Sequence, residues 1–548
     1  MKAKLKIGLL LNSPFVPFWF YCMIEVIQKG DFAEISTIIF RETSDNKSMW
    51  QRYSEIIKLL PLIVIQKLDK KIFPTKHDAF KLIDISPLVP NAFIIKVKPE
   101  TKRYFDSIND EDIDKIKDQK LDVIIRGGFK ILKGKILSEC SKYGIWSHHH
   151  GDNKTNRGMP ACFWEVTNKV PVCGGIVQIL SEKLDNGVVI DRAYIPTIHF
   201  SINKTMQGLY WQMYKSIPTR LKNLHEMGWD KFSSDVIEKF NSEINFYIYP
   251  LYKSPSFLKG LQAMFKIISR WVIIKYNVYF VFNKPKWIIA YHFGERKNLS
   301  LKDFKYLMPG KDSFWADPFI IKYKNETTIF FEEFPNRQNK GHISAINYDP
   351  KSKTFSKARI VLSEKIHLSY PFVFEDNDNL YMIPETKEFG SIRLYQYINN
   401  SFQFKETLID GIEAVDNTLI KHNNKWYLFC SVKNHPDAPS INLHIYHSDT
   451  LSGEWLPHKG NPIVSDCRTS RPAGSLFSTK SNLYRPIQDC SIRYGYVVRF
   501  YRVDELTPET YKEILVDSIE PKWDKKINAI HTYNFCDSLT VVDIHGKF

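Results

Sequence analysis

The sequence predicts two folded parts in one chain: an α/β part with a doubly wound parallel sheet, followed by an all-β part built as a five-bladed propeller. In the first half, apolar strands alternate with helices, which is the order of a parallel sheet with crossover helices. In the second half, the apolar period changes to two and one plan of strand, turn and strand recurs. A length of 548 residues also exceeds what one hydrophobic core supports.

The composition is that of an ordered globular protein, with 43% hydrophobic and 25% charged residues. The formal charge of +16 is spread along the chain, which argues against a nucleic-acid-binding tract but suits a phosphate-bearing substrate or an anionic membrane surface. The eight cysteines form no CxxC pair, so we expect reduced thiols and a cytoplasmic protein. No apolar run approaches the ~20 residues of a membrane span, and the apolar start fits a first strand better than a signal peptide.

Three apolar runs predict parallel strands over residues 4–11, 33–40 and 121–126. Helices are expected between them, over 16–29 and about 129–142. This order predicts the first, doubly wound domain.

The most chemically loaded stretch is GIWSHHHGDNKTNRGMPACFWE, residues 144–165. A strand over 143–147 carries its histidines to the carboxyl end, where α/β proteins place their sites. Imidazole moves protons near neutral pH, although a surface cluster of histidines is the simpler interpretation. A zinc site is not expected, because neighbouring residues of a strand point to opposite faces. Further on, we expect an antiparallel pair over 174–180 and 187–195 and a long helix over 203–226.

Three motifs give residues from 1 to about 230 a resemblance to the folate-dependent formyltransferases, the family of methionyl-tRNA formyltransferase and the sugar N-formyltransferases. The motifs are DVIIRGGFKIL at 122–132, RGMPACFWEV at 157–166 and GGIVQILSEKLDNGVVI at 174–190. The resemblance implies a formyltransferase domain with a Rossmann-like sheet. It also implies 10-formyltetrahydrofolate as co-substrate, an amine acceptor and no metal.

The same resemblance implies roles for individual residues. The family's catalytic Asn-x-His falls on Ser147 and His149. A shift of one residue would place it on His148 and His150 instead, and the Asn is missing either way. Asp185 matches the family's catalytic Asp. The implied reaction is attack of an amine on the formyl carbon, with His149 taking the proton and Ser147 helping to stabilise the oxyanion.

Two binding groups also follow from the resemblance. The pterin of the folate would lie against the backbone of Arg126, Gly127, Gly128, Phe129 and Ile131. The acceptor would be recognised by Trp146, Asp152, Asn153 and Arg157. Taken singly, a Gly-Gly pair more often marks a tight turn, and an acidic residue such as Asp185 more often belongs to a turn.

Residues 246–284 form a helical linker between the two parts. The linker helix is expected to pack on both neighbours, and a peripheral membrane contact through 255–283 is the alternative. We therefore place the formyltransferase-like domain at 1–245 and the propeller at 285–548. A homodimer fits this organisation as well as a monomer does.

The repeat of the second half starts near residues 316, 370, 416, 473 and 531. Its spacing of about 46 to 59 residues is typical of four-stranded propeller blades. The last repeat lacks its outer strands, so we expect residues 287–293 to supply one and to close the ring.

Polar residues near the start of each inner strand should meet at the axial mouth. They are Asp317, Tyr370, Asp416, Arg471 and His531, with Glu333 and Glu385 on the following strands. This part resembles the five-bladed propellers of glycoside hydrolases and, more closely, the amino-terminal propeller of the plant glucosamine inositolphosphorylceramide transferases. The resemblance implies a carboxylate set of Asp317, Glu385 and Asp416. Sugar binding through Trp315, Tyr370, Arg471 and Tyr494, or a merely structural role at blade ends, are the alternatives.

The main prediction is N-formyl transfer to an amino sugar, nucleotide-linked, in bacterial surface-glycan or lipopolysaccharide biosynthesis, with a carbohydrate-binding propeller. No nucleic-acid partner is expected. An enzyme similar to methionyl-tRNA formyltransferase is one alternative. The other is a propeller that works as a glycosidase, glycosyltransferase or glycan-binding protein beside a degenerate formyltransferase domain.

Overall fold

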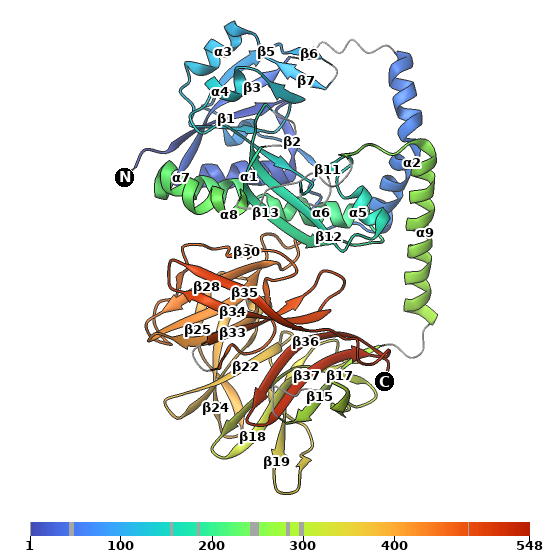
Figure 1. The fold of residues 1–548 in the computed structure, drawn as a ribbon, viewed down its shortest axis with the longest axis vertical. Coiled ribbons are helices and arrows are strands. Elements are labelled where there is room, and N and C mark those ends of the chain that lie inside the picture. Colours follow the sequence, from blue (N-terminus) through green and yellow to red (C-terminus); the bar gives the residue numbers. More distant parts are fainter. Residues whose placement is uncertain are drawn as a thin grey trace. The chain divides into compact units, whose positions relative to one another are not determined.

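The computed structural model describes residues 2–42, 49–102, 104–153, 157–182, 187–241, 251–280, 285–294, 301–479 and 482–548. It consists of two compact units, whose elements are labelled in Figure 1. Unit 1 contains Met1–Lys275 and Asn434–Pro439, and unit 2 contains Tyr276–Lys433 and Ser440–Phe548. Each unit has its own sheets and its own hydrophobic core.

Unit 1 is built on a seven-stranded sheet in the order β13-β12-β10-β8-β1-β3-β5. The strands from β10 to β5 run parallel, and β12 and β13 add an antiparallel edge. The predicted parallel sheet and antiparallel pair are therefore confirmed. The strands of this sheet are β1 Leu5–Leu11, β3 Ala33–Arg41, β5 Phe93–Val97, β8 Val123–Arg126, β10 Ile145–His149, β12 Val172–Ile179 and β13 Val188–Pro196. Shorter strands are β2 Phe15–Pro17, β4 Leu82–Asp84, β6 Glu100–Lys102, β7 Phe105–Ser107, β9 Ile131–Lys133, β11 Arg157–Gly158 and β14 Leu251–Tyr252.

Helices cover this sheet, with α1 and α7 against β3 and α3 against β5. The apolar run of β1 is buried throughout its second half, as expected for a central parallel strand. The helices are α1 Phe18–Lys29, α2 Met49–Ile72, α3 Asp110–Lys117, α4 Ile136–Glu139, α5 Phe163–Asn168, α6 Ile202–Met213, α7 Ser216–Phe232, α8 Glu238–Asn241 and α9 Phe257–Phe280.

Two of the expected helices differ from the structure. Residues 129–142 form the short strand β9 and the single turn α4, because Phe129 and Gly134 adopt positive φ values of 64° and 84° that no helix accommodates. The expected helix over 203–226 is divided into α6 and α7. Pro218 lacks the N–H that a continuous helix would direct to the carbonyl of Tyr214.

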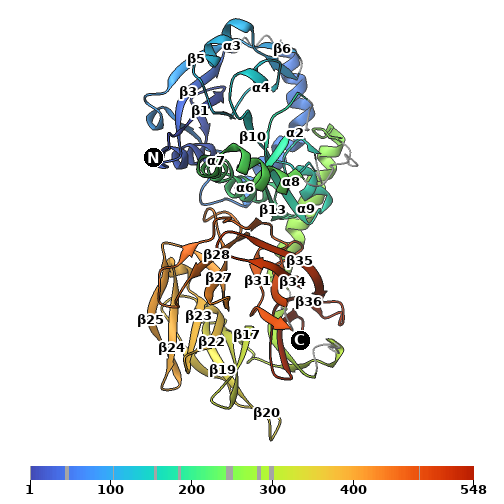
Figure 2. The same ribbon diagram turned by 60° about the vertical axis from the view of Figure 1, so that its left-hand side comes forward.

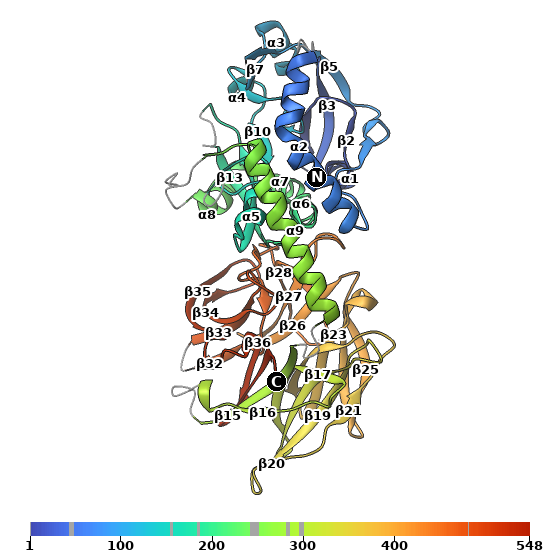
Figure 3. The same ribbon diagram turned by 90° about the vertical axis from the view of Figure 1, so that its right-hand side faces the viewer.

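Unit 2 contains five sheets, which form the blades of the predicted propeller (Figures 2 and 3). The inner strands lie next to one another around a ring: β17 beside β22 and β36, β22 beside β26, β26 beside β31, and β33 beside β36. The propeller fold is therefore confirmed. Blade 1 has β17 Ser313–Tyr323, β18 Glu326–Pro335, β19 His342–Asp349, β20 Thr354–Phe355 and β21 Arg359–Leu362; blade 2 has β22 Ser369–Asp376, β23 Asn379–Glu385, β24 Ser391–Ile398 and β25 Ser401–Asp410; blade 3 has β26 Ala414–His422, β27 Lys425–Val432, β28 Asn442–Ser448, β29 Leu456–Pro457 and β30 Val464–Ser465. Blade 4 has β31 Arg471–Pro472, β32 Phe477–Thr479, β33 Asn482–Asp489, β34 Val497–Leu506 and β35 Tyr511–Ile519; blade 5 has β36 Ile527–Cys536, β37 Leu539–Gly546, β15 Lys286–Phe293 and β16 Lys305–Leu307.

The ring closes through β15, the first strand of unit 2, which completes the last blade. It pairs antiparallel with β37 along its whole length, from Lys286 opposite Gly546 to Phe293 opposite Leu539. The expectation that residues 287–293 close the ring is confirmed. Ile288 of this strand is fully buried in the core between blades.

Four hairpins of the propeller share one turn. Their two turn residues both have positive φ, which is the type I′ geometry that matches the twist of the flanking strands. The turns are Lys324–Asn325, Asn377–Asp378, Asn399–Asn400 and Asn423–Asn424. Asn and Asp tolerate this conformation better than other residues with a side chain, so these pairs fix the register of the hairpins.

If β15 closes the ring, two Ile→Ala substitutions on blade strands should lower the free energy of unfolding by different amounts. Ile288→Ala opens a cavity in the closing strand and should lower the free energy of unfolding by about 2–5 kcal/mol. Ile514→Ala, on the 46% exposed side chain of β35, should change it by less than about 0.5 kcal/mol. Chemical denaturation of both variants measures this, and equal effects would show that β15 does not hold the ring.

Candidate functional site

The inner strands of three blades carry a strained residue at the same point. Asp317, Tyr370 and Asp416 have φ values of 52°, 47° and 56°, each within a β-bulge of β17, β22 or β26. A positive φ is uncommon for Asp and unusual for a residue as bulky as Tyr. The Tyr370 hydroxyl is fixed by contacts with Thr418 Oγ1 at 2.9 Å and the Gly474 N–H at 2.7 Å. Such strain at one place in the ring indicates a functional site.

A cavity of about 330 Å³ lies at this place in unit 2. This volume is within the range of small-molecule sites, about 300–1,000 Å³. All four residues predicted for the propeller site line it, namely Asp317, Glu385, Asp416 and Arg471. Its other charged or aromatic residues are Trp287, Phe314, Glu332, His367, Lys387, Lys433, Tyr494 and His531.

A histidine clamped between two carboxylates forms one wall of the cavity. The His531 ring lies 3.0 Å from Asp317 Oδ1 through Nε2 and 2.7 Å from Asp543 Oδ2 through Nδ1. Asp317 also accepts hydrogen bonds from Thr532 Oγ1 and from the Tyr370 N–H. Burial opposes the charged ring, but Asp543 and Asp317 outweigh it and hold the pKa of His531 well above 6.5. Burial likewise opposes ionisation of Asp317, yet the charge of His531 keeps the pKa of this carboxyl below its ordinary value.

The acid of β18 that faces the cavity is Glu332 and not Glu333, the residue named from the sequence. Burial, followed by the negative charge of Asp317, raises the pKa of Glu332 well above its ordinary value, which favours the neutral carboxylic acid. Glu333 lies on the opposite face of the strand. The His342 ring, whose Nε2 lies 3.5 Å from Glu333 Oε2, and a hydrogen bond from Ser344 Oγ contribute to lowering its pKa to about 2. The two neighbouring acids therefore differ in their tendency to ionise: Glu333 is a carboxylate, whereas the neutral form of Glu332 is favoured.

The remaining charges of the cavity are paired, with one exception. Arg471 Nε donates to Asp416 Oδ2 at 2.6 Å, and Lys387 lies 2.8 Å from Glu385. Burial raises the pKa of Asp416 to about 6 despite Arg471, so Asp416 is mainly ionised at neutral pH. Within the described residues, Lys433 has no ion pair or hydrogen bond. Its pKa is lowered by burial and by the charge of Lys387, which means that an added anion would stabilise it.

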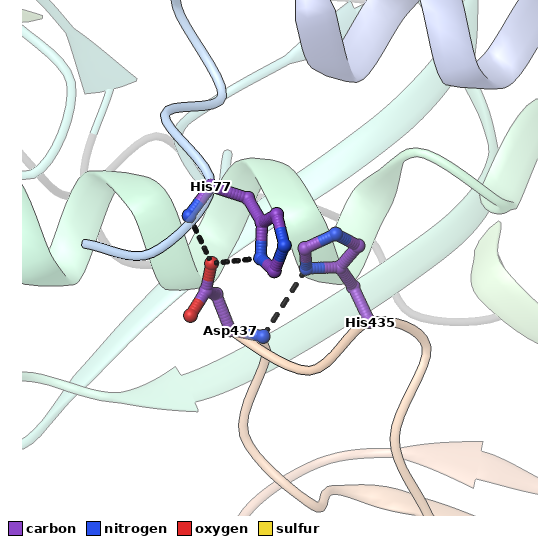
Figure 4. Close-up of side chains that lie close together, drawn as sticks. All are labelled: His77, His435 and Asp437. Atoms are coloured by element: carbon purple, nitrogen blue, oxygen red, sulfur yellow. Dashed lines mark hydrogen bonds and ion pairs between the residues drawn. The ribbon is translucent and has the colours of Figure 1, made fainter.

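Among the residues that the structure describes, two groups of side chains could hold a metal ion. The first is Asp317, His531 and Asp543, where the charged imidazole already balances the carboxylates and would have to lose its proton. The second, in unit 1, is His77, His435 and Asp437 (Figure 4).

Hydrogen bonds account for the second group. Asp437 Oδ2 accepts from the His77 N–H at 2.8 Å and lies 3.0 Å from its Nδ1. The Asp437 N–H donates to His435 Nδ1 at 3.1 Å, and the His435 ring stacks on Trp211 at 3.7 Å. The cluster anchors Asn434–Pro439 within unit 1.

In unit 1, the predicted catalytic histidines lie among aromatic rings. His148 packs edge-on to Trp19, and His150 stacks on Tyr210 at 3.5 Å. Burial lowers the pKa of His148 to about 4 and that of His150 well below 6.5, so both are weak proton acceptors. His149 lies between them and Ser147 directly precedes His148, both on β10, and the Ser147 side chain is buried. Asp185 lies outside the described residues.

The predicted binding residues of unit 1 contact other parts of the same unit. Trp146 is fully buried and stacked on Phe232. Asp152 is ion-paired with Arg192, which also donates to Asn153 Oδ1. Of Arg157 the structure describes only the backbone, in β11.

The space beside the residues predicted to bind the folate is occupied by other residues of unit 1. A side chain at Gly127 would meet Phe20 and Leu11, and one at Gly128 would meet the Asn12 backbone at 2.7 Å. Arg126 donates to the Phe129 and Lys130 carbonyls, and Ile131 begins β9. The glycines are thus required for packing within unit 1.

Fold and site together describe a β-propeller with an axial cavity lined by aromatic rings and by charged groups of both signs. Residues 307–540 match the family model "Glucosamine inositolphosphorylceramide transferase 1, N-terminal". Glucosamine inositolphosphorylceramide transferase 1 of Oryza sativa subsp. japonica is 34% identical over 210 residues, covering 37% of this chain and 28% of that protein. The Arabidopsis thaliana protein of the same name is 35% identical over 208 residues, covering 37% and 27%. The chain thus spans little more than a quarter of the length of these relatives.

Solved structures with a similar chain path include two glycoside hydrolases. The β-xylosidase RS223 is 11% identical with a TM-score of 0.33, covering 44% of this chain and 94% of that one. An α-L-arabinofuranosidase from Podospora anserina is 10% identical with a TM-score of 0.33, covering 48% and 98%.

These comparisons correct the main functional prediction. The family match lies within the propeller, and the relatives are plant transferases named for glucosamine and inositolphosphorylceramide. Folate-dependent formyl transfer in bacterial glycan biosynthesis is therefore contradicted, and the propeller-based alternative is favoured. The physical reason is visible in unit 1, where motifs that resembled a formyl-transfer site serve internal packing.

The clamp predicts one charged and one neutral histidine in the same cavity. His531 should remain an imidazolium at about pH 8, whereas His367, whose pKa burial lowers, should be neutral at about pH 7. Ring ¹⁵N chemical shifts measure both in one titration. Because the pKa of His531 is raised on folding, its stabilisation is complete below about pH 6.5 and is lost as the pH rises through the folded-state value. A neutral His531 at pH 7 would refute the clamp.

Proposed function

We propose that unit 2 is a carbohydrate-active domain that cleaves or transfers a glycosyl group in the axial cavity. The supporting observation is that a neutral acid, Glu332, and ionised carboxylates share one cavity. Glycosyl chemistry requires this pair of states, since one carboxylic acid protonates the leaving oxygen and one carboxylate assists on the other side of the bond.

The residues of the cavity suit these roles. Glu332 is the proton donor, because its pKa keeps it protonated near neutral pH. Asp416, with a pKa of about 6, is the base that activates water or an acceptor alcohol. Asp317 is a positioning residue: His531 and Tyr370 hold its carboxylate, and its charge helps to keep Glu332 protonated. Trp287 and the other aromatic rings offer faces for a sugar.

The proposed substrate is an amino-sugar glycoside that carries an anionic group. The names of the plant relatives include both glucosamine and a phosphoryl group. In this chain, Lys433 is the cation that such a group would pair with. Lys433, Lys387 and Val415 also line a second cavity of about 390 Å³, which gives room for more than one sugar unit.

Glycan binding without turnover is the second candidate. It is favoured by the pairing of Asp416 with Arg471 and of Asp317 with His531, which leaves fewer free carboxylate oxygens than a reaction would use. Measured turnover separates the two candidates.

Glu332→Gln should reduce turnover of the best substrate in a panel of alkyl glycosides and disaccharides, glucosaminides included, by about 10²–10⁴-fold, because their alcohol leaving groups depend on the proton donor. Glu333→Gln is the matched control and should stay within about twofold, since that side chain points away from the cavity. The wild-type rate should rise with pH near 6 as Asp416 ionises and fall at higher pH as Glu332 loses its proton. Equal losses in both variants would refute the assignment. Binding without turnover would leave only the second candidate.

Lys433→Met should weaken binding of glucose 1-phosphate by about 10-fold or more, because a hydrogen-bonded charge pair contributes about 1.5–3 kcal/mol. Binding of methyl glucoside should change by less than about twofold, since methyl glucoside carries no anionic group that could pair with Lys433. Titration calorimetry with both ligands measures this, and Lys433→Arg should retain the preference. Unchanged discrimination in Lys433→Met would remove Lys433 as the anion partner.

A further inference from the structure

Helix α9 leaves one long apolar stripe uncovered. The side chains of Leu258, Leu261, Phe265 and Val272 follow the helical repeat along one face and are 71%, 37%, 74% and 62% exposed. Ile273 beside them is 57% exposed. Exposed apolar side chains usually occur singly, so a continuous stripe requires an explanation.

The exposed stripe is not the face by which α9 packs against the rest of unit 1. The opposite face of α9 carries Ala263, Ile267 and Trp271, which are buried in a core shared with α2, α5 and α6. Arg270 reinforces this attachment by donating to the carbonyls of Val166, His199 and Thr167. The inner face alone fixes α9 to unit 1, and the outer stripe is available for another purpose.

Helix α2 lies next to α9 (Figure 3) and has exposed apolar side chains of its own. The two helices touch where Gly260 of α9 meets Pro61 of α2. The exposed apolar residues of α2 are Ile56, Ile57, Leu60, Val64, Leu68 and Ile72, between 38% and 60% exposed. Two adjacent helices therefore present apolar side chains to solvent.

The charges around the α9 stripe are all positive. Lys259 and Lys266 lie on one side of it and Lys275 on the other by the helical repeat, and the sequence of α9 contains no Asp or Glu. On α2, Lys58, Lys67 and Lys71 are exposed. This helix contains two acidic residues, Glu55 and Asp69, of which Asp69 is buried and bonded to Ser201 and to the Asn203 N–H. An apolar stripe flanked by lysines is the pattern of a helix that lies in the interface of an anionic membrane.

We propose that the exposed faces of α9 and α2 bind an anionic lipid surface, with the apolar stripe among the acyl chains and the lysines at the headgroups. A second copy of the chain fits less well. In a symmetric dimer the stripe would meet itself, which would bring the lysines of two α9 helices together without a carboxylate on either. No helix in the described ranges is long and apolar enough to span a bilayer.

The test is flotation of the full chain with phosphatidylcholine vesicles, with and without roughly 30 mol% phosphatidylserine. Wild type should bind the phosphatidylserine vesicles, and added salt should weaken the binding. Phe265→Asp combined with Val272→Asp should reduce the partition coefficient at least about tenfold, since both side chains would leave the acyl region. Lys259→Glu combined with Lys266→Glu should act in the same direction through charge.

The matched control changes the same residue types elsewhere. Phe404→Asp with Val516→Asp replaces side chains that are 52% and 45% exposed on propeller strands, and this variant should bind as wild type does. Circular dichroism melting checks that both double variants are folded. The proposal is overturned if wild type fails to bind, binds neutral vesicles equally well, or loses binding equally in the control variant. It is also overturned if light scattering shows a dimer that Phe265→Asp with Val272→Asp dissociates, because the stripe would then be covered by a second copy.

Discussion

The propeller depends on the charged ring of His531 held between Asp317 and Asp543. These residues come from the first and last blades, so the ion cluster lies where the ring closes. Buried charges cost several kcal/mol unless they are paired, and pairing here requires β17 and β36 to remain neighbours. The same cluster fixes the negative charge that helps to keep Glu332 protonated. The same ion cluster therefore holds the first and last blades together and sets the charge of the cavity.

The surface of unit 1 that is available for binding differs from the surface predicted from the sequence. The carboxyl end of its sheet, where the histidines lie, is packed with Trp19 and Tyr210 and with internal hydrogen bonds. Its unsatisfied apolar surface lies instead on two helices that lead away from the sheet. A chain that attaches to a lipid surface through one unit and holds a glycosyl group in the other would suit a glycoside that is itself attached to lipid.

Much of the fold could be predicted from the sequence because it depends on local periodicity. The parallel strands, the antiparallel pair and the five repeats all follow from apolar spacing, and Asp317, Glu385, Asp416 and Arg471 could be placed at the axis from the start of each repeat. Which of Glu332 and Glu333 faces the cavity could not be predicted from the sequence. A bulge at Asp317 shifts the pairing of β17 with β18, so counting across from Asp317 does not identify the acid of β18 that faces the same cavity. The resemblance of unit 1 to formyltransferases rested on glycines and aromatic residues whose role is packing, which a motif cannot distinguish from chemistry.

The bulges and the type I′ turns together divide the propeller into segments with different tolerance to changes in length. Between the bulge of β17 and the turn at Lys324–Asn325, loss of one residue would exchange the core and solvent faces of the strand. In the loops beyond the outer strands no such parity applies. Insertions and deletions among homologous propellers should therefore accumulate between blades. The number of residues from each bulge to its turn should stay constant, which gives a fixed reference for aligning the sequences of distantly related blades.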